Sequence, residues 1–184
     1  MKINFKNIDI KDLAILVSSE LEKNGINAVL VGGACVSIYT YNKYLSNDLD
    51  YVTPEPLDTI KPVLGNLGFY QKSSRHFEND ECPFFIEFPP SPVSIGNEVP
   101  ITKFNKIKSL RLFTPTDCVK DRLAAFYHWN DLQSLDQALM VAKAQKVNLK
   151  EIEKWSKREG AIEKFKRFLN LLKTKNEKYT QLKK

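Results

Sequence analysis

The spacing of apolar residues along the chain predicts its first elements. In residues 8–26 apolar side chains recur mostly every three or four positions and stop at Gly25, which predicts an amphipathic helix with a glycine end. Residues 27–31 form a short apolar run before two glycines, as a buried strand does, and residues 34–41 are expected to be helical. Residues 47–52 alternate polar and apolar side chains, which predicts a strand.

A further helix and four shorter strands are expected next. Residues 56–68 have helical spacing up to their glycines. The strand-like segments that follow cover residues 69–72, 75–79, 83–88 and 107–113. Together these elements predict a mixed α/β (α+β) domain over residues 1–113, without internal repeats.

The remainder of the chain has only helical spacing. Thr114 stands in a favourable N-cap position, Pro115 suits the first helical position, and Asp117 complements the helix dipole in the first turn. Apolar residues then continue at helical steps to residue 172, and four helices fit this length. We therefore expect a helical domain over residues 114–184, packed on the first domain.

The composition is that of a globular protein. Of the 184 residues, 42% are hydrophobic and 27% are charged, which is ordinary for a folded domain. The N-terminal segment has scattered charges where a signal peptide needs an apolar stretch, and nowhere do 18 apolar residues run together. The three cysteines form no CxxC pair, which is typical of reduced thiols. We expect a cytoplasmic protein that does not associate with membranes.

Charge divides unevenly along the chain. Residues 143–184 contain 14 Lys and Arg residues against 5 Asp and Glu residues, a net charge of +9. Residues 1–142 contain 14 against 17, a net charge of −3. Two interpretations of the basic tail stay open: a solvated helical surface, or a surface for a polyanion such as RNA.

Two aspartates and two glycines suggest a chemical site. Side chains two residues apart in a strand point to the same face, so Asp48 and Asp50 present their carboxylates together. Like charges held so close need compensation, and a divalent cation is the simplest one. Gly32 and Gly33 let the backbone approach a ligand closely, and the helix start after them offers N–H groups to an anion. These features predict a site for a metal-bound nucleoside triphosphate. Alternatively, the aspartates are solvated or cap turns, and the glycines only form a tight turn.

The stretch "GGACVSIYTYNKYLSNDLDY" resembles a known family. It is similar to nucleotidyltransferases of the DNA polymerase β superfamily, most of all to the AbiEii/AbiGii toxin-type (minimal) enzymes, whose signature runs approximately GGTAL, an aromatic residue, then R, S and DLDF. The likeness continues more loosely in "DRLAAFYHWNDLQSLDQAL". The resemblance implies a mixed sheet with flanking helices and a helical bundle. It also implies Mg²⁺- or Mn²⁺-dependent transfer of a nucleoside monophosphate from an NTP such as ATP, in a toxin–antitoxin or phage-defence setting.

The resemblance also implies roles for individual residues. Ser46 matches the serine ahead of the DLD motif. Glu87, flanked by apolar residues in "FFIEFP", offers the third carboxylate that the superfamily adds from a later strand, with an exposed strand residue as the alternative. The glycines that would position the triphosphate and the carboxylates that would bind the metal are Gly32, Gly33, Asp48 and Asp50.

The sequence departs from the family pattern at two positions. Ala34 stands where the family often has Thr or Ser, although Ser37 lies one helical turn further on and could contact phosphate. Tyr44 stands where an arginine is expected, and Lys43, out of register by one residue, could serve the triphosphate. Further cationic candidates, with solvated helix charges as the alternative, are Lys120 and Arg122.

Histidines and tryptophans carry less functional signal. His76 and His128 are 52 residues apart and have no cysteines at ligand spacing, so we expect no metal site from them. Trp129, Trp155 and the tail phenylalanines recur at helical spacing, which favours a place in the core over stacking on bases.

The acceptor stays open in the sequence. The basic tail favours an RNA end, such as that of tRNA, and a protein acceptor or protein partner is a further possibility within the family. A small-molecule nucleotidyltransferase would need an acidic acceptor site for a cationic substrate, which the basic tail disfavours. A catalytically weak, nucleotidyltransferase-like binding module is the third alternative, because of the departures at Ala34 and Tyr44.

Overall fold

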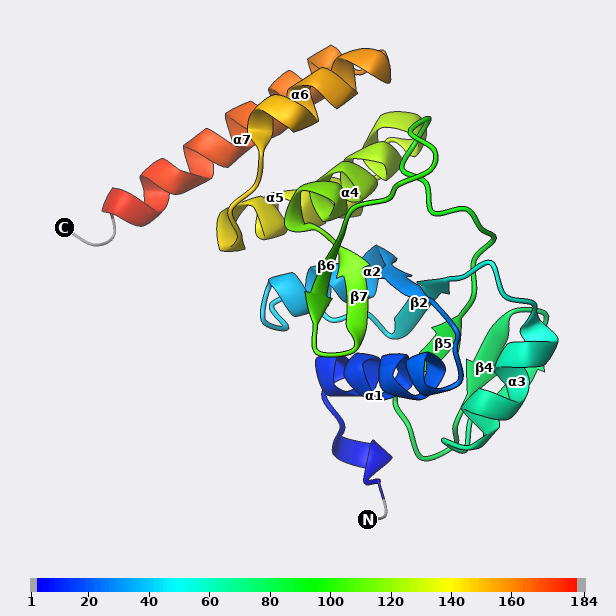
Figure 1. Cartoon of the computed structure of the whole chain (residues 1–184). Coiled ribbons are helices and arrows are strands. Elements are labelled where there is room, and N and C mark those ends of the chain that lie inside the picture. Colours follow the sequence, from blue (N-terminus) through cyan, green and yellow to red (C-terminus); the bar gives the residue numbers. More distant parts are fainter. Residues whose placement is uncertain (1–2, 182–184) are drawn as a thin grey trace. The chain divides into compact units, whose positions relative to one another are not determined.

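The computed structural model describes the backbone of residues 3–181 and the side chains of residues 3–174. All strands precede the last four helices, so the expected mixed α/β architecture with a helical C-terminal part is confirmed (Figure 1). In chain order the elements are η1 (Phe5–Asn7), α1 (Ile10–Lys23), β1 (Val29–Val31), α2 (Gly32–Tyr39), β2 (Asp48–Val52), α3 (Leu57–Gly65), β3 (Tyr70–Ser73), β4 (His76–Glu78), β5 (Phe85–Glu87), β6 (Phe104–Ile107), β7 (Leu110–Phe113), α4 (Pro115–Trp129), α5 (Leu132–Ala144), α6 (Leu149–Arg158) and α7 (Ile162–Gln181).

The chain divides into two compact units. The first comprises the residues up to Ser94 together with Glu98–Thr114, and the second comprises Ile95–Asn97 together with the residues from Pro115 onward. The division at Thr114 and Pro115 lies beside the boundary predicted from the sequence. The assignment of Ile95–Asn97 to the second unit was not expected. It follows from the side chain of Glu159, which accepts hydrogen bonds from the backbone N–H and the side-chain amide of Asn97, at 2.9 and 2.8 Å.

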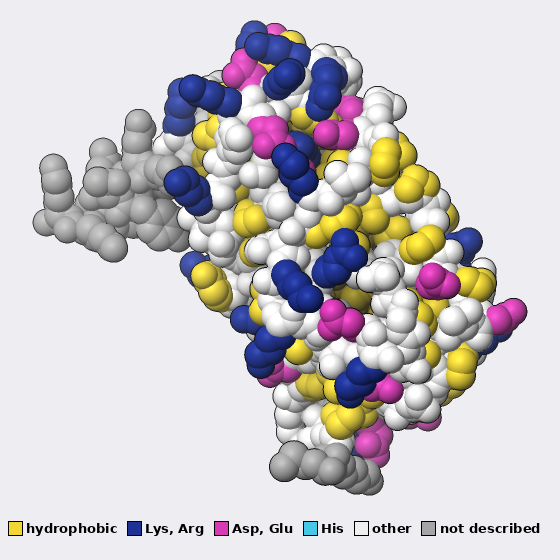
Figure 2. Space-filling view, in the orientation of Figure 1, with side chains coloured by type: hydrophobic (Ala, Val, Ile, Leu, Met, Phe, Trp, Pro, Cys, Tyr) yellow, Lys and Arg dark blue, Asp and Glu magenta, His cyan; other side chains and the backbone are white. Residues whose placement is uncertain are grey.

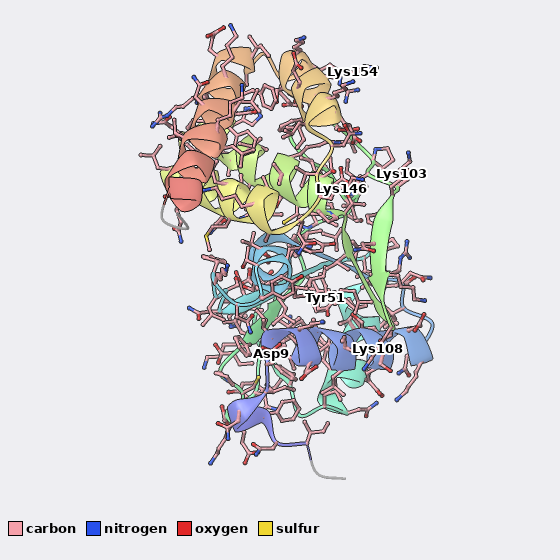
Figure 3. All side chains as sticks on the ribbon, turned by 90° about the vertical axis from the view of Figure 1, so that its left-hand side faces the viewer. Asp9, Tyr51, Lys103, Lys108, Lys146 and Lys154 are labelled. Atoms are coloured by element: carbon pink, nitrogen blue, oxygen red, sulfur yellow. The ribbon has the colours of Figure 1, made fainter. Side chains whose placement is uncertain are left out.

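The first unit is built on one seven-stranded sheet with the order β3-β4-β5-β2-β1-β7-β6. The sheet is mixed, because β2 pairs with β5 and β1 pairs with β7 in parallel while β1 and β2 run antiparallel. Helix α1 covers one face of this sheet: the fully buried Tyr51 hydroxyl donates to the carbonyl of Ala14 at 2.8 Å and lies 3.0 Å from the Ser18 Oγ (Figure 3). The polar residues of β2, Asp48 and Asp50, lie on the opposite face of the strand.

Helix α1 forms where the apolar spacing predicted it. It starts at the N-cap Asp9, whose side chain accepts from the Lys11 N–H at 2.8 Å, and it ends before Gly25, which has φ +75°. A positive φ favours glycine at this position, since other residues are strained there. The apolar stripe faces the core through its buried residues Ile10, Leu13, Ala14, Val17 and Leu21.

The predicted single strand over residues 107–113 is wrong. The chain instead forms a hairpin of β6 and β7, in which Ile107 pairs with Leu110 across the two-residue turn at Lys108 and Ser109. Lys108 takes the left-handed conformation, with φ +55°, that such short turns require. Because neither turn residue is Gly, Asn or Asp, the sequence lacks the usual hairpin signal.

Besides Ile95–Asn97, the second unit contains the four helices α4 to α7, as the sequence predicted. Trp155 is fully buried and stacks on Tyr127 with ring centroids 5.4 Å apart, so its predicted core position is confirmed. For Trp129 the prediction is wrong: its side chain is 78% exposed, because it is the last residue of α4 and the chain turns away at Asn130. Lys164 caps the C-terminal end of α4: its Nζ donates to the carbonyls of Phe126 and Tyr127 at 3.1 and 2.6 Å.

The described part of the chain contains neither a helix that could span a membrane nor a disulfide bond. No helix between residues 3 and 181 is long and apolar enough to cross a membrane. The cysteines of the same segment, Cys35, Cys82 and Cys118, form no disulfide.

Candidate functional site

The candidate site is built around the turn from β1 into α2. Gly32 follows β1 directly and has φ +69°, and a Cβ placed on it would overlap with the carboxylate of Asp50. A Cβ on Gly33 would lie only 2.5 Å from the Ser46 Oγ. Both positions therefore require glycine, because the side chains of the neighbouring loop and strand lie directly against the turn.

Strand β2 places its two aspartates on one face. Asp48 and Asp50 are half-buried, whereas Leu49 and Tyr51 are fully buried on the opposite face. The residue paired with Asp50 on β1 is Val31, the N-cap of α2, so the second aspartate stands at the level of the helix start. Val31 supplies no side-chain hydrogen bond to the first turn of α2.

Glu87 joins these aspartates on the neighbouring strand. In the parallel pairing of β2 with β5, Asp50 is opposite Glu87 and Asp48 is opposite Phe85. Directly paired residues on adjacent strands share a face, at a strand spacing of about 4.8 Å. Three carboxylates therefore project from the same side of two adjacent strands, although 32 residues of chain, 53–84, separate β2 from β5.

His76 is the neighbour that sequence reasoning missed. It is paired with Glu87 across β4 and β5, and its Nδ1 lies 3.0 Å from the Glu87 Oε1 while its Nε2 lies 2.8 Å from the Glu78 Oε1. The ring stacks on Phe85 with centroids 4.4 Å apart. The hydrogen bond to Glu87 raises the pKa of His76 above its usual value, against the opposing effect of burial. The H-x-E spacing in β4 could have suggested a shared face for His76 and Glu78, but not the contact with Glu87.

Glu78 is held in turn by Lys72 of β3. The Lys72 Nζ lies 3.1 Å from a Glu78 carboxylate oxygen, and hydrogen bonds from Lys72 and then from His76 lower the pKa of Glu78. A polar row thus runs across β3, β4 and β5 to Glu87, with alternating positive and negative groups.

Two serines fix the loop that enters β2. The Ser46 hydroxyl donates to the Asp48 Oδ1, and the Ser46 backbone N–H donates to the Ser37 Oγ at 2.9 Å. Ser37 in turn donates to the carbonyl of Gly33 at 3.4 Å. Because Ser37 is fully buried and its hydroxyl serves the backbone on both sides, its position does not favour the predicted phosphate contact. It ties the glycine turn to the loop before Asp48.

The cationic candidates have different surroundings. Lys43 is exposed in the loop between α2 and β2 and forms no ion pair with the residues that the structure describes. Lys120 belongs to the second unit, is almost fully buried, and pairs with Asp117 at 3.0 Å and Glu151 at 2.7 Å. Arg122, also in the second unit, pairs with Asp121. Lys120 is therefore not the solvated helix charge that was its alternative role, and the ion pairs of both residues favour structural roles within that unit.

The carboxylates are not arranged as a finished metal site. Among residues 3–174, no group of three or more His, Cys, Asp and Glu side chains is placed to hold a metal ion as it stands. Asp50 lies against Gly32, and Glu87 contacts His76. Metal binding here requires rotation of these half-buried side chains.

Comparisons with models of known protein families, with curated proteins and with solved structures give no match for this chain. The geometry and the residue types of the site, together with the resemblance of its motif, are the basis for a functional proposal.

Proposed function

We propose that the protein is a metal-dependent nucleotidyltransferase, which moves a nucleoside monophosphate from a nucleoside triphosphate to an acceptor hydroxyl. The observation that carries the proposal is the register that brings Asp48, Asp50 and Glu87 to one face of β2 and β5, beside the glycine turn at the start of α2. Carboxylates from adjacent strands next to the N-terminal turn of a helix suit a metal ion together with a phosphate chain.

The three carboxylates are the residues that would hold Mg²⁺ or Mn²⁺, since both ions prefer oxygen ligands. When bound, the metal would orient the α-phosphate, stabilise the leaving pyrophosphate and lower the pKa of the acceptor hydroxyl. The chain's own contribution is positioning. Gly32 and Gly33 would let the backbone approach the β- and γ-phosphates, Ser46 fixes one oxygen of Asp48, and Lys43 offers an exposed positive charge on the loop before β2.

A terminal hydroxyl of RNA is the acceptor that the charge of the second unit favours. Lys and Arg side chains gather over α6 and the start of α7 (Figure 2). Not all of them are available, because Lys157 pairs with Glu153 and Lys166 pairs with Glu163. Exposed lysines without an acidic partner among the described residues are Lys146, Lys150, Lys154 and Lys173. These are the residues through which phosphates would be bound.

The proposed metal and triphosphate site is tested with the double variant Asp48→Asn with Asp50→Asn. Titration with ATP and Mg²⁺ or Mn²⁺ should raise the melting temperature of the wild type and not that of the variant, because the variant loses both ligands. The unliganded variant should be at least as stable as the wild type, since the repulsion between the carboxylates is removed. Asp58→Asn is the matched control, as Asp58 is an exposed residue of α3.

One result would contradict the proposed nucleotide site, and another would contradict the proposed transfer activity. An equal rise in melting temperature for wild type and double variant would place the nucleotide elsewhere. Triphosphate binding that depends on the aspartates, with no transfer of α-³²P label to RNA or protein, would favour the alternative of a nucleotidyltransferase-like binding module.

A further inference from the structure

Tyr44 reaches back from the loop before β2 to the glycine turn. Its Oη lies 3.6 Å from the position of a Cβ on Gly33, and the Ser46 Oγ lies 2.5 Å from the same point. Both hydroxyls are thus beside the first turn of α2. The neighbouring large side chains of the loop point outward, with Tyr41 76% exposed and Leu45 60% exposed, whereas Tyr44 is half-buried.

The loop holds Tyr44 in this position from both sides. The Tyr44 backbone N–H donates to the Thr40 Oγ1 at 3.4 Å, and Thr40 itself donates to the carbonyl of Val36 at 2.7 Å. After Tyr44, the Ser46 N–H is bound by Ser37. The ring therefore extends from a backbone that is anchored on α2 before it and after it.

The Tyr44 hydroxyl has no hydrogen-bond partner among the residues that the structure describes. A phenol hydroxyl at the edge of a packed ring is a hydrogen-bond donor that water or a ligand can accept from. Here the hydroxyl is directed at the backbone of a glycine turn whose amides are suited to phosphate. The hydroxyl is not among the buried polar atoms that lack a partner in the described residues, so it reaches solvent beside this turn and can donate to an anion bound there.

We propose that the Tyr44 hydroxyl donates a hydrogen bond to a phosphate oxygen of the nucleoside triphosphate above Gly33, which makes Tyr44 a substrate-binding residue. The inference rests on the proposed function and adds that the phosphate chain is held by a neutral donor at this position. The positive charge near the phosphates then comes from the bound metal and from Lys43, not from the residue that contacts the glycine turn.

Tyr44→Phe tests this inference, because it removes the hydroxyl and keeps the ring. The probe is the nonhydrolysable triphosphate α,β-methylene-ATP with Mg²⁺, titrated by calorimetry into wild type and variants. Loss of a hydrogen bond to a charged group should weaken binding about tenfold or more. The melting temperature without nucleotide should not change, since the hydroxyl has no described protein partner. Tyr41→Phe, in the same loop with an exposed ring, is the matched control and should bind as the wild type does.

The variants separate the two proposals. If Asp48→Asn with Asp50→Asn abolishes binding while Tyr44→Phe binds within about twofold of the wild type, the role of Tyr44 is overturned and the proposed function stands. A lower melting temperature of unliganded Tyr44→Phe, with unchanged affinity, would likewise overturn it in favour of a structural role. If the wild type fails to bind the probe, both proposals fail together.

Discussion

Glu87 and His76 lie side by side on the neighbouring strands β5 and β4, and the imidazole ring contacts the carboxylate. The carboxylate of Glu87 stands opposite Asp50 on one side and contacts the His76 ring on the other. His76 is shared with Glu78, so the imidazole sits between two carboxylates. The positive charge of a protonated His76 offsets part of the repulsion among these acids.

Glu87→Gln should separate binding from transfer. The amide keeps the size of the side chain but is a poor metal ligand, so one of the three proposed ligands is lost while Asp48 and Asp50 remain to hold the metal and the triphosphate. We expect α,β-methylene-ATP affinity to stay within about threefold of the wild type and label transfer to fall about 100-fold. Glu81→Gln, in the exposed turn after β4, should transfer at the wild-type rate. Unchanged turnover of Glu87→Gln would make Glu87 an ordinary surface residue.

The pKa of His76 predicts how stability depends on pH in metal-free buffer. Because the folded-state pKa is raised, the contribution of the protonated ring is complete below the unfolded pKa of about 6.5 and is lost as pH rises through the folded value. Relative to His76→Gln, which does not titrate, the wild type should therefore be more stabilised at about pH 5.5 than at about pH 8.5. Urea unfolding at both pH values measures this difference. A difference that is flat or grows with pH would contradict the assigned charge state.

At the scale of the elements, α2 packs closely against β2 and the loop before it because Gly32 and Gly33 have no side chains at the start of α2. Gly33→Ala should lower the free energy of unfolding by about 1–3 kcal/mol, since its Cβ meets the Ser46 Oγ. Gly65→Ala is the control, because a Cβ at this last residue of α3 meets no atom within 4 Å and should be neutral or stabilising by up to about 1 kcal/mol. Thermal or urea unfolding of both variants measures the contrast. Equal effects would show that the turn is not closely packed.

Periodicity in the sequence predicts which helices and strands form, but it does not predict which of them lie next to one another. The α1 helix, the aspartate face of β2 and the four tail helices follow from local spacing alone, because a helix or strand face depends on nearby residues. The partner of β2 does not follow from local spacing, because Asp50 and Glu87 come together through a parallel pairing of residues 37 positions apart in the chain. His76 was missed for the same reason, since its contact with Glu87 depends on the pairing of β4 with β5.

At the scale of the whole molecule, the basic tail of residues 143–184 belongs to the helical unit, whereas residues 1–142 comprise the sheet unit together with α4 and most of α5. The structure changes which basic residues suit RNA. Lys164, on the first turn of α7, is turned inward to the end of α4, so its charge serves that helix end. Lys146 and Lys154 lie outside such contacts among the described residues (Figure 3).

Affinity for RNA should therefore depend on α6. For three to five phosphate contacts with a single strand, the slope of log K against log salt concentration should be roughly −2 to −3.5. Lys150→Glu with Lys154→Glu should flatten this slope, whereas the same charge change in the first unit, Lys103→Glu with Lys108→Glu, should alter it less. Titration of labelled tRNA at several salt concentrations measures both slopes. Binding of tRNA no tighter than about 10⁻⁴ M at low salt would exclude RNA as the acceptor.

The central claim is that Asp48, Asp50 and Glu87 converge on a metal-bound triphosphate. It is tested most directly by crystals soaked with Mn²⁺ and α,β-methylene-ATP, measured at the manganese absorption edge. We expect an anomalous peak within about 2.5 Å of carboxylate oxygens from β2 and β5, with the phosphate chain over the glycine turn. Manganese and triphosphate bound elsewhere on the chain, with these three carboxylates in their unliganded positions, would contradict it.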